Sequence, residues 1–405
     1  MAAPRRIVFL GTHGQYNIGD ELLLETFLTQ LGAEHRYVVN SYDPAFTRAQ
    51  LADRFTVTVI DTATERARLL RALRTADVLC FGGGSIIKEL YASTGRHRYS
   101  TMLMILAIVT FTRQIARKPI AMLNVGVGPI RSPGGRRIAR LILRQVDELS
   151  VRDRRSLELC REIGVPARAA TDAVFSLDAA ALLEEAAAVS PPADPVSRPA
   201  APVRVALNLN FDVENPANWE SFLTGLAHAL TVLHAQQPIE LHTLPMQTGF
   251  KSHDDAEVLA EFAGRIPGIP VVRHDLRTPG DVAAVIRDCD VVLSERLHAI
   301  VLASILGVPS FALVYDQKVG ELAAMLRMQR WSLDINSPFD ADALAGQLVD
   351  LVRERVAVAG RVEQVTAELR TRARADFDRA RRWVAGGSPA SQDAEFALAG
   401  PSGQG

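Results

Sequence analysis

The chain has 405 residues, of which 48% are hydrophobic and 22% are charged, and its formal net charge is −1. This length and composition are typical of a globular protein with two domains. The near-zero net charge gives no indication of binding to nucleic acid or to an anionic membrane, so any anion site must be built locally from a few Arg and Lys side chains.

The cysteines and the apolar windows indicate the cellular compartment. Cys80, Cys160 and Cys289 form no CxxC motif, and each lies among apolar residues. We therefore expect buried, reduced thiols in a reducing, cytoplasmic compartment. The apolar run near the start is too short for a signal peptide. Residues 102–111 are too few to span a bilayer and predict a buried or interfacial helix.

Strands and helices alternate in the first half of the chain, which predicts a doubly wound parallel sheet. Strands are expected at residues 6–10, 37–41, 57–61, 76–81, 121–130 and 149–153. A helix is expected after the first strand, capped by Asn17 or Asp20, and further helices are expected from Ile86 and from Arg154.

Glycine-rich turns follow three of these strands. They contain Gly11, then Gly82, Gly83, Gly84 and Ser85, and then Gly126. Glycine lets a ligand approach the backbone and leaves N–H groups accessible. The glycines at positions 11, 14 and 19 do not fit GxGxxG, so a dinucleotide fingerprint is not expected. A turn that simply needs positive φ explains the first of these segments equally well.

A Pro- and Ala-rich segment separates the two halves. We expect a Rossmann-like domain at residues 1–180, a linker at 181–202 and a second Rossmann-like domain at 203–340. Helices follow at 341–385, and a disordered tail at 386–405. The second domain repeats the alternation, with strands expected at residues 204–210, 239–244, 270–274, 290–294 and 310–314.

The turn after the strand at 290–294 carries the clearest chemistry. Ser294, Arg296 and His298 lie between that strand and the next helix, at the edge where parallel α/β sheets bind ligands. Helix N–H groups and Arg296 favour a carboxylate or phosphate, and His298 can carry a proton near neutral pH. The turn predicts an anionic substrate that needs proton transfer. In the alternative, Arg296 only pairs with Glu295 or a nearby Asp, and His298 only caps the helix.

Six segments, taken together and in order, resemble the polysaccharide pyruvyltransferase family. They are residues 11–21, 82–85, 125–129, 150–157, 171–172, and 296–299 with Lys318. The resemblance implies a GT-B-like pair of Rossmann-like domains. It also implies transfer of a pyruvyl group from phosphoenolpyruvate to two hydroxyls of a cell-surface glycan, which forms a cyclic ketal and releases phosphate. No metal is expected, and phosphoenolpyruvate is a co-substrate rather than a cofactor.

The same resemblance implies roles for individual residues. Donor binding maps onto Arg296, Leu297, Lys318 and, in the first domain, Arg152, and we add Ser294 from the same turn. A catalytic Asp maps onto Asp254 or Asp255, with Asp255 preferred, and His298 would share the acid–base work with it. Acceptor or phosphate contacts are expected from Gly11, Asn17, Asp20, Gly82, Gly83, Gly84, Ser85 and Gly126.

Two other functions remain open at this point. The chain could be a GT-B glycosyltransferase that uses a nucleotide-sugar, or a non-catalytic sugar-binding protein. Asp288 and Asp290 have the spacing of a DxD metal motif, but we expect them to end a helix and start a strand. The acceptor sugar and the oligomeric state are also open. A lipid-linked acceptor would place the cytoplasmic enzyme at the inner face of the membrane.

Overall fold

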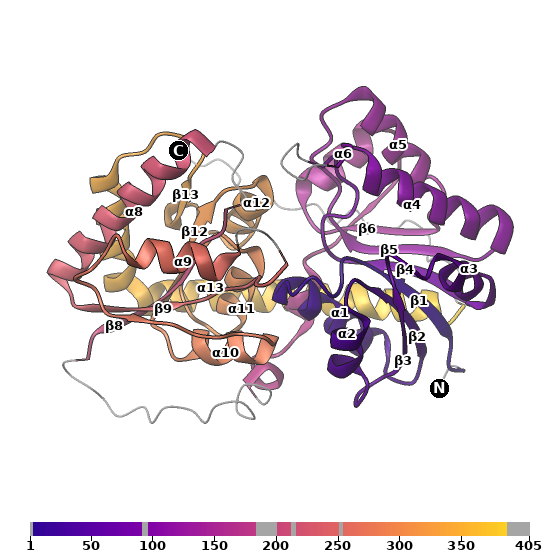
Figure 1. The fold of residues 1–405 in the computed structure, drawn as a ribbon, viewed down its shortest axis with the longest axis horizontal. Coiled ribbons are helices and arrows are strands. Elements are labelled where there is room, and N and C mark those ends of the chain that lie inside the picture. The colour runs from indigo at the N-terminus through magenta and orange to yellow at the C-terminus, as the bar shows by residue number, and fades with distance from the viewer. Residues whose placement is uncertain (1–2, 91–95, 184–200, 212–215, 251–253, 387–405) are drawn as a thin grey trace. The chain divides into compact units, whose positions relative to one another are not determined.

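The chain folds into two compact α/β units, each built around its own parallel sheet (Figure 1). The computed structural model describes residues 3–90, 96–183, 201–211, 216–250 and 254–386. Unit 1 comprises Met1–Gln15, Leu23–Ser176 and Thr371–Gly405, and unit 2 comprises Tyr16–Leu22 and Leu177–Arg370. The first and the last α-helix each contribute residues to both units.

Unit 1 contains a seven-stranded sheet with the order β3-β2-β1-β4-β5-β6-β7. Every residue of β4 and β5 is buried, which is the pattern of parallel strands covered on both faces. The strands are β1 (Arg6–Leu10), β2 (Arg36–Ser41), β3 (Thr56–Asp61), β4 (Val78–Gly82), β5 (Ile120–Val125), β6 (Glu148–Val151) and β7 (Arg168–Ala169).

The helices of unit 1 cover both faces of this sheet. The chain runs one way along the sheet from β1 to β3 and the other way from β3 to β7, so right-handed crossovers place α1 and α2 on one face and α3 to α6 on the other. The helices are α1 (Ile18–Leu31), α2 (Pro44–Leu51), α3 (Arg66–Thr75), α4 (Ser100–Thr110), the π-helix η2 (Phe111–Ala116), α5 (Pro133–Leu143), α6 (Arg154–Glu162) and the 3₁₀ turn η3 (Ala173–Ser176).

Unit 2 contains a six-stranded parallel sheet with the order β10-β9-β8-β11-β12-β13. Its strands are β8 (Val203–Asn208), β9 (Ile239–Thr243), β10 (Val271–Val272), β11 (Val291–Ser294), β12 (Ser310–Val314) and β13 (Ser332–Asp334). Its helices are α8 (Pro216–Gln236), α9 (Asp255–Ala263), α10 (Pro279–Arg287), α11 (Leu297–Ile305), α12 (Gln317–Met325) and the 3₁₀ turn η4 (Gln329–Trp331). Helix α11 is buried along its whole length apart from His298.

The chain ends in a 44-residue helix, α13 (Ala341–Val384). Its residues up to Arg370 belong to unit 2, and those from Thr371 belong to unit 1. Within unit 1, the Phe377 ring packs on Phe27 with centroids 5.2 Å apart, and Asp376 pairs with Arg168. The helix was predicted correctly, but its two ends are parts of the two units rather than a separate C-terminal segment.

The predicted fold class is confirmed, since both halves are parallel α/β sheets. The helix predicted from Ile86 is wrong. Gly83 and Gly84 adopt positive φ of 61° and 65°, and Ile87 forms a parallel bridge with Val127. The segment after β4 therefore continues to pair with the residues that follow β5 instead of forming a helix.

The first domain was predicted at residues 1–180, and its limits differ from those of unit 1. The first unit ends at Ser176 and takes up the C-terminal residues from Thr371. Most of the predicted linker, residues 184–200, and most of the predicted tail, residues 387–405, lie outside the described residues.

Candidate active site

The side chains predicted to bind the donor lie at one edge of the unit 2 sheet. In a parallel sheet all strands end at the same edge, and ligands of such folds bind there. Ser294 is the last residue of β11, Arg296 is the N-cap of α11, and Lys318 lies in the first turn of α12, just after β12. Strands β11 and β12 are hydrogen-bonded neighbours. The fold therefore brings Arg296, His298 and Lys318 to the same edge.

Arg296 is held by a buried carboxylate. Its Nη2 lies 2.6 Å from Asp255 Oδ1, and its Nε lies 3.2 Å from Asp255 Oδ2. Both side chains are nearly removed from water, with 11% and 2% exposed. A bidentate pair of this kind fixes both the position and the plane of the guanidinium. Arg296 thus pairs with a nearby Asp, as the alternative from the sequence allowed.

Asp255 accepts four hydrogen bonds from three residues. Besides the two from Arg296, Asn208 Nδ2 and the Met246 backbone N–H each donate to Oδ2 at 3.0 Å. Three of the four hydrogen bonds fall on Oδ2 and one on Oδ1, and all of them come from the protein. This arrangement suits a group that positions Arg296.

Asp254 does not contact Arg296 in the way that Asp255 does, and instead caps a helix. It is the N-cap of α9, and its side chain accepts from the backbone N–H groups of Glu257 and Gly249, each at 3.0 Å. Capping of this kind stabilises a helix and satisfies two backbone donors. The acid–base role that the resemblance implies for Asp254 or Asp255 stays a prediction.

Asn208 joins the Arg296 turn to Asp255, and reasoning from the sequence missed it. Its side chain is fully buried at the end of β8. Its Oδ1 accepts from Ser294 Oγ at 3.2 Å and from the Arg296 backbone N–H at 3.1 Å, while its Nδ2 donates to Asp255. An Asn at the end of a buried, apolar strand is the signal that could have identified it.

Glu295, which the sequence offered only as a possible partner of Arg296, contacts Asn210. Its carboxylate is fully buried and accepts from Asn210 Nδ2 at 2.9 Å. Gln247 is also buried, and its Oε1 accepts from Arg296 Nη2 at 3.3 Å. Polar groups in these two positions extend the network that holds the Arg296 turn.

His298 lies against the start of α1. A Cβ built on Gly19 would approach its Nδ1 to 2.2 Å, so only glycine fits there without moving the ring. The loop that carries Gly19 is attached to unit 2, because the Ile18 backbone N–H donates to the Met246 carbonyl at 2.9 Å and Asn17 bridges to Gln247. The glycine-containing motif near residue 19 therefore forms one wall of the His298 site.

The choice of cap for α1 is settled by geometry. Asn17 Oδ1 accepts from the Gly19 backbone N–H at 3.1 Å, and the Asn17 carbonyl accepts from Asp20. Asn17 is therefore the cap, and Asp20 lies in the first turn, where an acidic side chain is favourable.

The other predicted donor residues have distinct surroundings. Lys318 Nζ lies 3.8 Å from Asp316 Oδ2 and 5.2 Å from the centre of the Tyr315 ring. Ser294 Oγ accepts from the Arg296 backbone N–H at 2.9 Å. Leu297 is buried, which indicates a packing role for its side chain.

In unit 1, a second arginine is held at the carboxyl edge of the sheet. Arg152 follows β6 and is 5% exposed. Its Nη1 lies 3.0 Å from Asp172 Oδ2, and its Nη2 lies 3.2 Å from Ser85 Oγ. The predicted residues Arg152 and Ser85 are thus brought together, with Asp172 as the charge partner.

Glycines make room for this cluster. A Cβ on Gly126 would meet Ser85 Oγ at 2.8 Å, and the Gly126 backbone N–H donates to the Gly84 carbonyl at 2.7 Å. A Cβ on Gly82 would meet the Phe9 ring at 2.3 Å, which is a packing requirement. Gly11 is tied to a neighbouring strand by its N–H, which donates to Asn40 Oδ1 at 2.9 Å.

The possible DxD motif is structural. Asp288 caps the end of α10, and Asp290 Oδ2 accepts from the Arg204 backbone N–H at 2.9 Å just before β11. In the part of the chain that the structure describes, no three His, Cys, Asp or Glu side chains are grouped to hold a metal ion.

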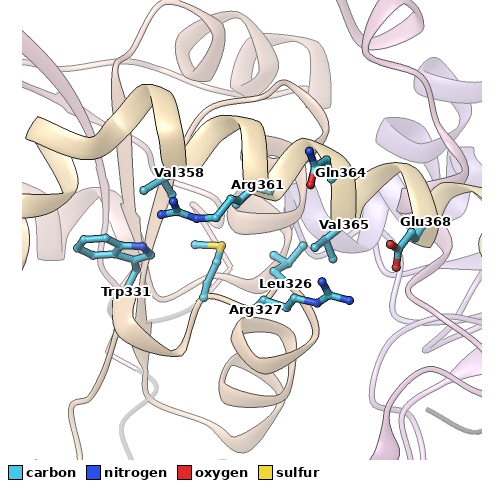
Figure 2. Close-up of a pocket in the computed structure, with 10 residues that line it drawn as sticks. Leu326, Arg327, Trp331, Val358, Arg361, Gln364, Val365 and Glu368 are labelled. Carbon is cyan, nitrogen blue, oxygen red and sulfur yellow. The ribbon is translucent and has the colours of Figure 1, made fainter. Parts of the chain in front are cut away.

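A pocket of about 200 Å³ lies elsewhere in unit 2, beside α13. Figure 2 shows Trp331, Arg361 and Glu368 around it. Its other wall, residues 326–331, leads from the end of α12 into β13, at the amino edge of the parallel strands. It is therefore distinct from the Arg296 site at the carboxyl edge.

The family is identified by residues 17–317, which match the polysaccharide pyruvyl transferase family. This range contains Arg152, Asp255, Arg296 and His298. The chain belongs to this family. It is therefore a member of a family of transferases that act in polysaccharide biosynthesis.

A curated relative agrees with this family. The amylovoran biosynthesis protein AmsJ of Erwinia amylovora is 22% identical over 285 residues, which cover 67% of this chain and 65% of AmsJ. The match thus spans slightly less than two thirds of that relative.

Solved structures show the same GT-B-like fold. HepE from Anabaena, in complex with UDP and glucose, has a TM-score of 0.61 at 14% identity and covers 94% of this chain and 100% of its own. A putative UDP-N-acetylglucosamine 2-epimerase from Listeria monocytogenes has a TM-score of 0.57 at 13% identity, with 94% and 96% covered. At these identities the likeness concerns the fold alone.

Proposed function

We propose that the protein transfers a pyruvyl group from phosphoenolpyruvate to two hydroxyls of a glycan, forming a cyclic ketal and releasing inorganic phosphate. The observation that carries this proposal is the Arg296 guanidinium, which the buried Asp255 carboxylate holds in place. Arg296 lies two residues before His298 in the sequence. This spacing places an anion-binding group and a proton-carrying group in one turn of a chain that belongs to the pyruvyl transferase family.

The donor carries a carboxylate and a phosphate, so its binding needs fixed positive charge. Asp255 binds Nε and Nη2 of Arg296 and thereby fixes the plane of the guanidinium, a group whose geometry suits a carboxylate or phosphate. Lys318, after the neighbouring strand, supplies a second cation on a flexible stem. Charge-assisted contacts of this kind gain strength where water is excluded.

The chemistry requires proton transfers that His298 can perform. A proton is added to the methylene carbon of the donor, which makes its C2 electrophilic. The first acceptor hydroxyl attacks C2 and loses its proton. The bond from C2 to the phosphate oxygen then breaks, and the second hydroxyl attacks the same carbon and loses its proton. One of these protons leaves with phosphate, and the other balances the one added to carbon.

Asp255 acts, in this proposal, by positioning Arg296. Its four hydrogen bonds all come from the protein, and two of them hold the Arg296 guanidinium. Asp254 is the cap of α9. His298 is therefore the residue that we assign to the proton transfers.

The direct test measures phosphate released from phosphoenolpyruvate in the presence of glycan fragments, with mass spectrometry of the glycan. We expect phosphate release only when a suitable acceptor is present, together with one added pyruvyl group for each phosphate. Candidate acceptors are hexose- and hexosamine-containing oligosaccharides, both free and lipid-linked.

The glycosyltransferase alternative makes the opposite prediction in the same assay. Incubation with UDP-sugars and the same acceptors would then release UDP and add a sugar, and phosphoenolpyruvate would be left unchanged. That result would overturn the proposed function.

A further inference from the structure

One part of unit 1 is strongly basic, although the net charge of the whole chain is only −1. Between Glu89 and Asp147 the sequence contains ten Arg and Lys residues and no Asp or Glu. Since the whole chain has a charge of −1 and this stretch has +10, the rest has −11. Helix α3 adds four arginines and no acidic residue within its own length.

The same elements expose large apolar side chains. Eight such side chains are exposed among the described residues. Five of them lie on α3, α4, η2 and α5: Leu70 (41%), Leu103 (48%), Met104 (46%), Ile115 (60%) and Leu141 (51%). Single exposed apolar residues are normal on a protein surface, whereas a group of them marks an interaction site.

These elements lie in one layer on the same face of the unit 1 sheet. The crossover direction places α3, α4 and α5 together, and Figure 1 shows α4 beside α5. Tyr99 Oη lies 2.6 Å from Ser132 Oγ at the starts of α4 and α5, and Gln145 Nε2 donates to Thr110 Oγ1 at 3.3 Å near their ends. The two helices therefore run side by side in the same direction.

Helix α3 joins this layer through a cation–π contact. The Arg74 guanidinium lies 5.6 Å from the centre of the Phe111 ring, at the start of η2. We call α3, α4, η2 and α5 together the basic helical face.

We propose that the basic helical face docks on the surface of an anionic lipid bilayer. Leu103, Met104 and Ile115 would enter the boundary between head groups and acyl chains, and the exposed arginines of the same helices would bind lipid phosphates. The described chain contains no helix long and apolar enough to cross a membrane, so the attachment is peripheral. The residues that carry it are separate from Arg296, His298 and Arg152, and the proposal does not depend on the pyruvyl transfer.

The composition of the face favours lipid over other partners. Arg137, Arg140 and Arg144 are exposed along α5, and none of them forms an ion pair with another described residue. Exposed arginines and exposed aliphatic side chains on the same group of helices match an anionic interface. Single-stranded nucleic acid would instead call for exposed aromatic rings on which bases stack.

The test uses the full chain and sedimentation with vesicles of phosphatidylcholine alone or with added phosphatidylglycerol. We expect binding to the anionic vesicles, weakened by salt, and little binding to the neutral ones. Replacing Arg137, Arg140 and Arg144 with Gln should lower the partition coefficient at least tenfold, since each surface arginine contributes about fivefold. Ile115→Ser, from the same face, should also weaken binding.

Matched controls lie outside the face. Val356→Ser removes an exposed apolar side chain from α13, which is 82% exposed, and Arg353→Gln removes an exposed charge from the same helix. Both should bind like the unchanged protein. Circular dichroism and thermal unfolding confirm that every variant is folded. Absence of vesicle binding by the unchanged protein, or equal binding to both kinds of vesicle, overturns the proposal. So does a change in oligomeric state caused by Ile115→Ser without any change in lipid binding.

Discussion

Gly19 and His298 are in such close contact that a Cβ on Gly19 would approach the imidazole Nδ1 to 2.2 Å and the His298 Cβ to 3.2 Å. Gly19 lies in the first turn of α1 and does not adopt positive φ. Its backbone conformation is therefore open to any residue, and the lack of a side chain is required by the neighbouring ring alone.

Gly19→Ala should accordingly displace the His298 ring and lower kcat by about tenfold or more, because misplacing a reacting group by about 1 Å can cost about 10²-fold in rate. The matched control is Gly346→Ala, a glycine within α13 where an added Cβ would meet no other atom within 4 Å. That change should leave the rate intact and stabilise the fold by up to about 1 kcal/mol. Equal rates for both variants would show that the contact has no part in catalysis.

His298→Ala should lower kcat by about 10² or more if the imidazole transfers protons, since general acid–base groups contribute about 10²–10⁴-fold. Phosphate release at saturating phosphoenolpyruvate and acceptor measures this directly. His228→Ala serves as the control, because that side chain is 48% exposed and pairs with Asp342 on α13. A folded His298→Ala variant with near-normal turnover would assign the residue to structure.

The two adjacent acids can be separated by isosteric changes. Asp255→Asn leaves the buried Arg296 without its charge partner, so it should destabilise the fold by about 3–5 kcal/mol and raise the KM for phosphoenolpyruvate. Asp254→Asn should be nearly neutral for stability, because Asn caps helices about as well as Asp. Thermal unfolding and steady-state kinetics measure both effects. Loss of turnover in Asp254→Asn with unchanged stability would instead make Asp254 the catalytic acid or base.

Arg152→Lys keeps the positive charge but loses the planar fork that contacts Asp172 and Ser85 together. If Arg152 binds the donor, as the family resemblance implies, this variant should have a higher KM for phosphoenolpyruvate. Arg136→Lys, on the same unit and paired at the surface with Glu162, should have an unchanged KM. An unchanged KM for Arg152→Lys in a protein with reduced thermal stability would indicate a purely structural pair.

Acid pH should destabilise the protein through His274. Burial, together with the charge of the neighbouring His242, lowers the pKa of His274 below its ordinary value of 6.5. The two rings are stacked, with nitrogen atoms 3.0 Å apart, and His242 also contacts Glu240. The unfolded chain therefore takes up a proton as the pH falls below about 6.5 while the folded protein does not, so the free energy of unfolding decreases.

The corresponding measurement is the difference in Tm between pH 7.5 and pH 5.5. This difference should be smaller in His274→Gln than in the unchanged protein, and His228→Gln should leave it unaltered. His35 contributes in the same direction, because burial also lowers its pKa, so the change in His274→Gln is partial. A pH dependence identical in both variants would contradict this assignment.

The sequence predicted the strands well because buried parallel strands are short apolar runs. The predicted strands at residues 6–10 and 310–314 match β1 and β12 to the residue. It failed for the helix predicted from Ile86, because the backbone of Ile87 pairs with Val127. Local sequence patterns do not show backbone pairing with a residue forty positions away.

The sequence predicted those site residues that directly follow a strand. Arg296, His298 and Lys318 could be found because they follow strands directly, and the sheet edge gathers them. Asn208, Glu295 and Gln247 act through contacts with distant segments, and a single sequence does not show which segments these side chains contact. The division between Asp254 and Asp255 likewise depends on which carboxylate faces Arg296, which only the folded chain determines.

The division of α13 between the two units has a consequence for how the protein is made. Phe377 covers Phe27, and Asp376 neutralises Arg168, yet both are supplied from the far end of the chain. On the ribosome, the first half of the protein cannot complete its own interior until nearly all of the polypeptide has emerged. A fragment cut at the Pro-rich segment near residue 190 would keep Phe27 uncovered and should aggregate, so the two halves are not independently expressible pieces.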